Sequence, residues 1–134
     1  MSHTSVMTIV AVLSLLFGVP LALAPDAMMS LYGLKGDMAA RGLGRLYGVS
    51  LVGFAAIAWA VRALPPGPAA RSLCGAFAVG NGLAALVGVY IQVNGVSNAL
   101  GWTTPVLYGL LAVACWGAAR PDRSVDDVGR PAHR

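Results

Sequence analysis

The sequence predicts an all-α integral membrane protein, a four-helix transmembrane bundle with short loops and a short interfacial helix after the first span. Four apolar stretches are each long enough to cross the bilayer core, which needs about 20 mainly apolar helical residues. The stretches cover residues 6–24, 40–61, 72–93 and 100–118. Hydrophobic residues make up 57% of the chain and charged residues 10%, whereas soluble proteins carry roughly 25% charged residues. The mean hydropathy is +0.74.

The four spans leave no length for a second folded domain in a chain of 134 residues. We expect residues 1–120 to form the transmembrane domain and residues 121–134 to form a disordered, basic, cytoplasmic tail. The net charge of +4 includes four arginines in the last fifteen residues. A basic tail of this kind is not the folded basic face of a nucleic-acid-binding protein, so no nucleic acid partner is expected.

The first span ends in Ala22-Leu23-Ala24, which resembles a signal-peptide cleavage site. Two features oppose cleavage. The residues before Val6 contain no Lys or Arg, and Pro25 follows the site directly. We therefore expect this span to be retained as a transmembrane helix.

The segment after the first span, residues 25–37, is expected to be more than a loop. It carries the apolar residues Met28, Met29, Leu31, Tyr32 and Leu34. Their pattern predicts a short amphipathic helix lying in the membrane interface. Asp26 is expected to cap the start of this helix, and Asp37 the start of the second span.

The remaining connections are short. Residues 64–68 read Leu-Pro-Pro-Gly-Pro, which predicts a tight link. Residues 94–101 form the turn into the fourth span, where Thr103-Thr104-Pro105 predicts a late helix start or a kink.

The distribution of basic residues predicts the orientation of the bundle. Four crossings place both termini and the link between the second and third spans on one side of the membrane. That side carries Arg62, Arg71 and the arginines of the tail, and the other carries Lys35, Arg41 and Arg45. The positive-inside rule then predicts a multi-pass protein of the cell membrane with both termini in the cytoplasm.

Small residues recur at the spacing that lets transmembrane helices pack closely. Gly44, Gly48 and Gly53 form such a series in the second span, and the pairs Ala78/Gly82 and Ala84/Gly88 form another in the third. Close backbone contact through small residues holds helices together in lipid. We expect packing within one chain to be their main role, with a homodimer as the alternative.

Arg45 is the most informative charged residue. Asp37, Arg41 and Arg45 are spaced four residues apart and share one helix face. Arg41 is expected to reach the headgroups, a behaviour known as snorkelling. For Arg45, about two turns into the helix, two interpretations stay open: snorkelling to the headgroups, or facing a polar pocket, with Asp37 as its partner.

Two amides lie on the third span. Asn81 and Gln92 fall on almost the same helix face, with Ala85 and Gly88 between them. Together with Arg45 they predict an outward-facing polar pocket, for which Tyr47, Tyr90, Trp102 and Tyr108 could supply walls. The alternatives are a hydrogen bond from Asn81 to a neighbouring helix and an interfacial position for Trp102.

Several classes of function are disfavoured. No Asp or Glu lies inside a span, so a proton-coupled exporter lacks its carboxylate. The histidines, His3 and His133, stand near the two ends of the chain, so we expect no metal and no cofactor. Cys74 and Cys115 are far apart in sequence and form no CxxC motif, so reduced packing cysteines are expected.

The order of certain features resembles the DoxX-like superfamily of small four-helix membrane proteins. They are Leu15-Leu16-Phe17-Gly18 running to Ala24-Pro25-Asp26, then Leu31-Tyr32-Gly33-Leu34, then Arg41–Gly48 opening the second span. The resemblance covers nearly the whole chain but includes no catalytic motif. It implies a four-helix bundle in a group that includes subunits of membrane oxidoreductase complexes, although this chain shows no redox ligands of its own.

Three functional hypotheses remain, in descending order. The first is a protein that binds a lipophilic small molecule through Arg45, Asn81, Gln92, Tyr108 and Trp102, or that serves as an accessory subunit of a membrane partner. The second is a membrane-embedded isomerase, cyclase or hydrolase acting on a lipid-soluble substrate. Its candidate catalytic residues are Arg45 as electrophile and Asp26, Asp37 or Tyr108 for proton transfer. The third is an anion pore that uses Arg45 for selection.

Overall fold

The computed structural model describes residues 2–120, and this part of the chain is helical without any strand. The helices are α1 (His3–Leu23), α2 (Pro25–Leu31), α3 (Met38–Arg62), α4 (Pro68–Val93), the 3₁₀ helix η1 (Ala99–Trp102) and α5 (Thr103–Ala119). Four of the helical stretches are long and apolar enough to cross a membrane, with η1 and α5 together making the fourth. The predicted all-α, four-helix membrane bundle is confirmed. The expected tail, residues 121–134, lies outside the described residues.

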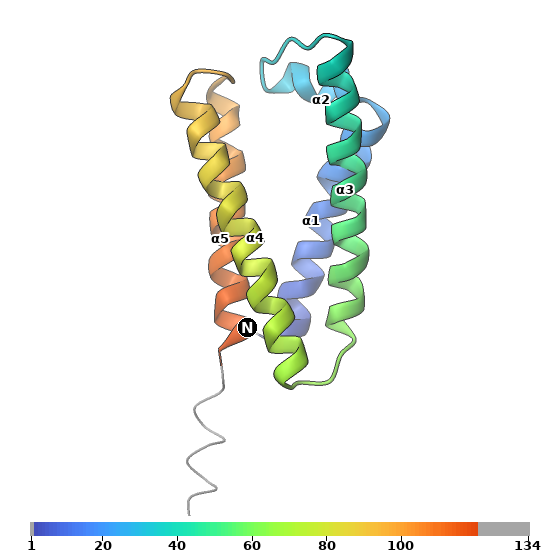
Figure 1. The fold of residues 1–134 in the computed structure, drawn as a ribbon, viewed down its shortest axis with the longest axis vertical. Coiled ribbons are helices and arrows are strands. Elements are labelled where there is room, and N and C mark those ends of the chain that lie inside the picture. Colours follow the sequence, from blue (N-terminus) through green and yellow to red (C-terminus); the bar gives the residue numbers. More distant parts are fainter. Residues whose placement is uncertain (1, 121–134) are drawn as a thin grey trace, which may run out of the picture.

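The bundle consists of two antiparallel helix pairs (Figure 1). One pair is α1 with α3 and the other is α4 with α5, and most contacts between helices occur within these pairs. The pairs lie close together at the end where α1 begins, which we call the N-terminal end. They diverge toward the opposite end, which carries α2 and which we call the α2 end. This divergence decides where a site can form.

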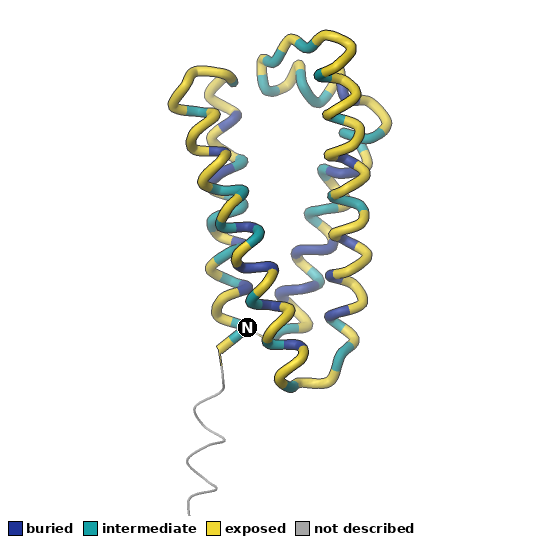
Figure 2. The backbone as a smooth tube through the Cα atoms, viewed as in Figure 1, coloured by how far each residue is buried: buried dark blue, intermediate teal, exposed yellow. Residues whose placement is uncertain are grey.

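The hydrophobic core lies at the N-terminal end, where all four long helices contribute to it. Figure 2 shows that most of the buried residues lie in the lower half of the bundle. The cluster comprises Val6, Met7, Val10, Ala11, Ala58, Val61, Cys74, Phe77, Ala78, Leu111 and Cys115. Because these residues come from the start of α1 and α4 and the end of α3 and α5, the core holds the two pairs together at this end only.

Glycines set the close approach of α1 to α3. A Cβ atom added to Gly18 would lie 2.9 Å from the Cβ of Leu51, and one added to Gly48 would collide with the backbone nitrogen of Ala22. The prediction of close intramolecular packing is confirmed at Gly48. It is wrong at Gly53, where an added Cβ would meet no atom within 4 Å.

Glycines also set the close approach of α4 to α5. A Cβ added to Gly88 of α4 would lie 3.2 Å from the ring of Pro105 in α5, and one added to Gly82 would lie 4.0 Å from Ala112. The late start predicted for the fourth span is confirmed, because the 3₁₀ helix η1 precedes α5 and Pro105 falls in the first turn of α5.

Helix ends confirm one predicted cap and contradict another. The Asp37 carboxylate accepts a hydrogen bond from the Ala40 amide at 2.9 Å, so the predicted cap of α3 is confirmed. The predicted cap of α2 by Asp26 is wrong. Ala24 occupies the cap position, and Asp26 lies in the first turn, where its carboxylate is free to pair with a neighbouring cation. Pro25 at the first helical position needs no amide partner, which makes a side-chain cap less important here.

Hydrogen bonds join the two pairs at the α2 end. The backbone amide of Asn98 donates to the carbonyl of Tyr32 at 2.9 Å. The Asn98 side-chain amide donates to the carbonyl of Leu31, also at 2.9 Å. Gly33 follows with a φ of +70°, and a Cβ there would lie 3.3 Å from Asn98. Asn98 therefore links the loop before η1 to the loop after α2.

Candidate functional site

Two tyrosines connect α3 to α5 in the half of the bundle nearer α2. The hydroxyl of Tyr47, in the third turn of α3, lies 2.6 Å from the hydroxyl of Tyr108, in the second turn of α5. Tyr47 is half exposed, with 48% of its surface accessible, whereas Tyr108 is more buried. This contact is a direct side-chain hydrogen bond between the two helix pairs.

A small cavity lies beside Tyr108 and borders the core. It has a volume of about 20 Å³ and is lined by Leu13, Ser14, Phe17, Leu51, Leu107, Tyr108 and Leu111. These residues come from α1, α3 and α5, so the cavity lies between the two pairs. A polar cavity above about 10–15 Å³ can hold one water molecule. The volume therefore suits one oxygen-sized group.

The polar groups available at this cavity are few. Ser14 and Tyr108 supply hydroxyl groups, and the other lining side chains are apolar. Among residues 2–120, the Ser14 hydroxyl makes no hydrogen bond to another residue, and the two tyrosine hydroxyls bond only to each other. In a hydrogen-bonded pair of phenols one hydroxyl donates to the other, which leaves the second with a proton to donate elsewhere.

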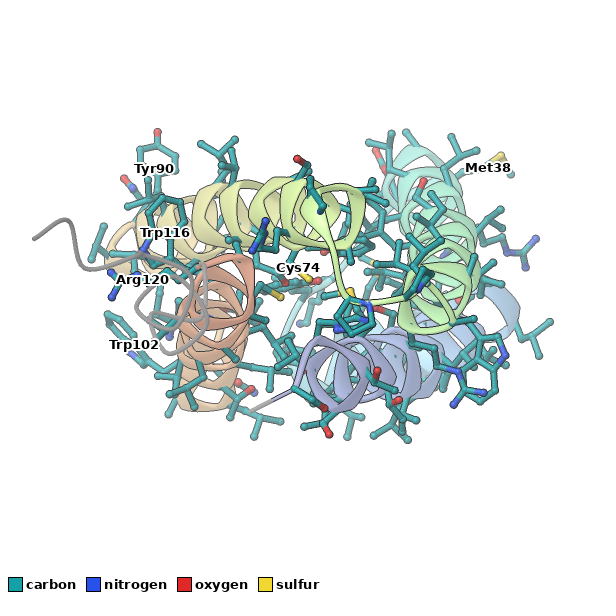
Figure 3. All side chains as sticks on the ribbon, turned by 90° about the horizontal axis from the view of Figure 1, so that it is seen from below. Met38, Cys74, Tyr90, Trp102, Trp116 and Arg120 are labelled. Atoms are coloured by element: carbon teal, nitrogen blue, oxygen red, sulfur yellow. The ribbon has the colours of Figure 1, made fainter. Side chains whose placement is uncertain are left out.

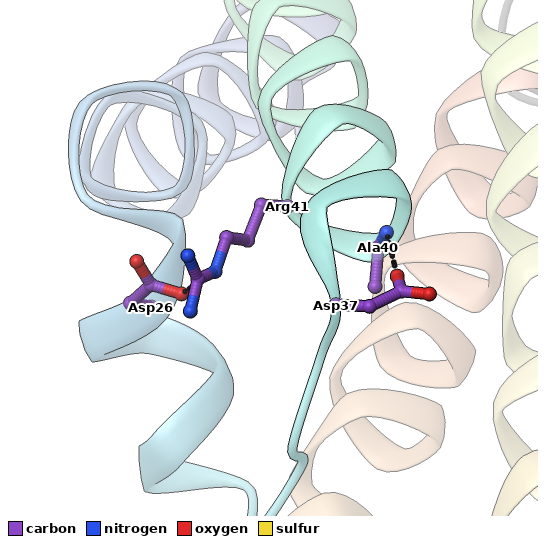
Figure 4. Close-up of polar contacts among 4 residues, drawn as sticks. All are labelled: Asp26, Asp37, Ala40 and Arg41. Atoms are coloured by element: carbon purple, nitrogen blue, oxygen red, sulfur yellow. Dashed lines mark hydrogen bonds and ion pairs between the residues drawn. The ribbon is translucent and has the colours of Figure 1, made fainter.

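The structure places Arg45 at the surface. Arg45 is exposed, and no ion pair or hydrogen bond of its side chain occurs within the described part of the chain. The predicted pairing with Asp37 is not formed, because that carboxylate caps α3 instead. Figure 4 shows Asp37 turned toward the amide of Ala40, away from the neighbouring ion pair.

The ion pair at this end joins Arg41 to Asp26. The guanidinium Nε of Arg41 lies 2.7 Å from a carboxylate oxygen of Asp26 (Figure 4). Both side chains are more than half exposed, at 53% and 65%. An exposed pair of this kind contributes about 0–1 kcal/mol. It ties α2 to α3 and leaves Asp26 at the surface, away from any enclosed volume.

The two amides of α4 make local bonds. Asn81 is buried, and its side chain donates to the carbonyl of Phe77, one turn earlier, at 2.7 Å. Gln92 donates to the carbonyl of Asn98 at 2.8 Å and accepts a hydrogen bond from the Ser97 hydroxyl at 2.5 Å. Gln92 thus stabilises the turn after α4. Neither amide bonds to Arg45, so their joint role in ligand binding stays a prediction.

Trp102 points away from the other helix pair. Figure 3 shows Trp102, Tyr90 and Trp116 at the margin of the α4–α5 pair, on the side opposite Met38. Trp102 is 46% exposed and ends η1. This position fits the alternative of an interfacial aromatic residue. Of the predicted ligand-binding residues, Tyr108 is the one that lines the cavity.

The cysteines belong to the core. Cys74 of α4 and Cys115 of α5 are both free and fully buried in the same hydrophobic cluster. Packing cysteines were expected, and this arrangement confirms them. Within residues 2–120, no group of three or more His, Cys, Asp or Glu side chains is placed to hold a metal ion.

Comparisons of the chain with protein-family models, with characterised proteins and with solved structures found no match. The resemblance to the DoxX-like superfamily therefore stays a prediction.

The sequence did not predict the contact between Tyr47 and Tyr108 or the part played by Ser14. Tyrosines inside apolar spans were the available signal, because a buried phenol needs a hydrogen-bond partner. Nothing in the spacing of these residues shows that α3 and α5 approach each other, since 61 residues separate the two tyrosines.

Proposed function

We propose that this chain is a non-catalytic integral membrane protein that binds a lipophilic small molecule between its two helix pairs. The observation that carries the proposal is the cavity of about 20 Å³ beside Tyr108, which is lined by residues of both helix pairs. Its wall is apolar except for two hydroxyl groups, which matches a ligand that is mainly hydrocarbon with a small polar group.

The architecture supports entry from the bilayer. Along their whole length, α3 and α4 make few contacts with each other. The pairs diverge toward the α2 end (Figure 1), and α3 and α4 meet in an edge-to-face contact of Phe54 with Phe77, whose ring centroids are 5.2 Å apart. A drug-sized ligand needs about 300–1,000 Å³. The cavity therefore receives only the polar group, and the hydrocarbon part extends outward past the half-exposed Tyr47.

An enzymatic role finds less support. Proton transfer requires an acid or base within hydrogen-bond reach of the reacting group. Asp26 is paired with Arg41 and Asp37 caps α3, both at the surface. No carboxylate, histidine, lysine or arginine lines the cavity within residues 2–120. Binding without chemistry is the function that these positions favour.

We propose the orientation predicted by the basic residues, with both termini in the cytoplasm. The α2 end then faces outward, and the site opens toward the outer leaflet. Cysteine accessibility in intact cells tests this with single cysteines in a background lacking Cys74 and Cys115. A thiol at Lys35 is expected to react with a membrane-impermeant reagent, and one at Arg71 is not.

Mass spectrometry of small molecules that co-purify in mild detergent tests the binding function. The wild type is compared with Ser14→Leu, which fills the cavity, and with Ser50→Leu as a matched control. Ser50 is exposed on α3 and bonds only to the carbonyl of Leu46, one turn earlier. We expect one discrete lipophilic species in the wild type and in Ser50→Leu, and its loss in Ser14→Leu. Identical bulk lipids in all three proteins would refute the proposal.

A groove on the α4–α5 pair favours a second candidate function, that of an accessory subunit. It has a volume of about 300 Å³ and is lined by Ala78, Val79, Ala112, Val113 and Trp116. Small residues beside an aromatic ring are typical of surfaces where transmembrane helices meet. An accessory subunit expressed without its partner should be degraded quickly, so a long half-life of the chain expressed alone would count against this candidate.

A further inference from the structure

One hydroxyl proton of the Tyr47–Tyr108 pair can be donated to a ligand, and this limits the chemical class of the ligand. The two hydroxyls lie 2.6 Å apart, and no third residue among those described accepts from either of them. A hydroxyl without an acceptor in an apolar setting costs free energy. One hydroxyl proton of the pair therefore has no acceptor among the described residues, and the cavity beside Tyr108 has room for an acceptor.

Charge restricts the acceptor further. The cavity wall contains no cationic side chain within residues 2–120, and the nearest arginine in sequence to Tyr47, Arg45, is exposed. A carboxylate or phosphate placed there would be an uncompensated charge in a medium of low dielectric constant, which is strongly unfavourable. The acceptor must be neutral.

The volume of the cavity also restricts which acceptor can bind. About 20 Å³ accommodates one oxygen atom with little else. Apart from Ser14 and Tyr108, the side chains around the cavity are apolar, among them Leu13, Phe17 and Leu107, and offer no hydrogen bonds. A carbonyl oxygen meets these conditions because it accepts hydrogen bonds, carries no charge and projects from its chain as a single atom.

We propose that the tyrosine pair is the specificity-determining part of the site and donates a hydrogen bond to the carbonyl oxygen of a neutral, membrane-soluble ketone or ester. The assignment rests on the proposed binding function and adds the chemical class of the ligand. Tyr108 lies against the cavity and contacts the ligand, while Tyr47 orients the Tyr108 hydroxyl from α3. Ser14 supplies a second hydroxyl from α1 at the same cavity.

Isotope-edited infrared spectroscopy tests the assignment directly. The probe is a long-chain methyl ketone with ¹³C at its carbonyl, added to the full-length protein in discs of ether-linked phospholipid, which lacks ester carbonyls. A hydrogen bond lowers the carbonyl stretching frequency. We expect the wild type to produce a second, lower-frequency carbonyl band that saturates at one ketone per protein.

The variants separate the site from general hydrophobic binding. Tyr108→Phe is expected to abolish the lower band, and Tyr47→Phe to weaken or shift it. Tyr90→Phe is the matched control, because Tyr90 is 68% exposed on α4, and it should leave the band unchanged. Each change removes one oxygen and keeps the ring, so packing is preserved. If Tyr108→Phe does not fold, the Tyr47→Phe spectrum decides the question alone.

The outcomes distinguish this inference from the proposed function. A band that persists in both Tyr47→Phe and Tyr108→Phe would overturn the carbonyl assignment and leave the binding function standing. A fatty acid of the same length, labelled at its carboxylate, is expected not to saturate a site. Its binding at the affinity of the ketone would overturn the neutral class. An unshifted ketone together with no co-purifying lipophile would overturn both proposals.

Discussion

The two ends of the bundle are held together by different forces. At the N-terminal end, fully buried side chains from all four long helices form the core. At the α2 end, the pairs meet through hydrogen bonds of Asn98 and of the Tyr47–Tyr108 pair. In a bilayer, buried packing is dense and hard to rearrange, whereas one interhelical hydrogen bond contributes about 0.6 kcal/mol. The N-terminal end therefore fixes the fold, and the α2 end can open.

The largest expected effect comes from the core. Met7 is fully buried, and Met7→Ala is expected to destabilise the protein by about 2–5 kcal/mol, because it leaves a cavity that its neighbours fill only partly. Leu16→Ala on the same helix is the control, since Leu16 is 61% exposed and its loss should change stability little. Reversible unfolding in mixed micelles measures both. Equal losses in the two variants would contradict the position assigned to the core.

A smaller loss of stability is expected when the contact between α1 and α3 is disturbed. Gly48→Ala forces a methyl group against the backbone of Ala22 and is expected to cost about 1–3 kcal/mol. Gly53→Ala, on the same helix, meets open space and should be neutral or slightly stabilising because alanine favours helix. The same unfolding assay compares the two. A neutral Gly48→Ala would mean that the pair is looser than the structure shows.

The smallest effect is expected at the α2 end. Asn98→Ala removes the side-chain hydrogen bond to the carbonyl of Leu31 and should reduce overall stability by about 1 kcal/mol. Hydrogen exchange is expected to rise at residues 31–33 and to stay unchanged in the core. Asn94→Ala is the control, because Asn94 bonds only to Tyr90 in its own helix. Faster exchange throughout the bundle would show that the two ends are not independent.

The helices and some of their ends could be predicted because they depend on residues that are close together in the sequence. Apolar runs of about 20 residues define the spans, and the cap from Asp37 to Ala40 bridges three residues. The Asp26 prediction was wrong because its carboxylate pairs with Arg41, fifteen residues later and on another helix. Local sequence shows which groups could cap, but it does not show which distant partner competes for them.

The candidate site, too, was predictable only where it depends on residues close together in sequence. Arg45 and the two amides stood out because polar residues in a span are costly, yet the amides bond locally and Arg45 lies at the surface. The residues that come together instead, Ser14, Tyr47 and Tyr108, are on three different helices.

By itself, the sequence determined the membrane-embedded class, the four spans, the cap of α3 and the small residues available for packing. These depend on hydropathy and on contacts a few residues apart. Only the tertiary structure decided that α1 pairs with α3 and α4 with α5, that Gly48 is packed while Gly53 is open, and that Tyr108 bonds to Tyr47 and borders a cavity between the pairs. The reason is that lipid solvates all apolar faces almost equally, so hydropathy alone does not select which faces meet.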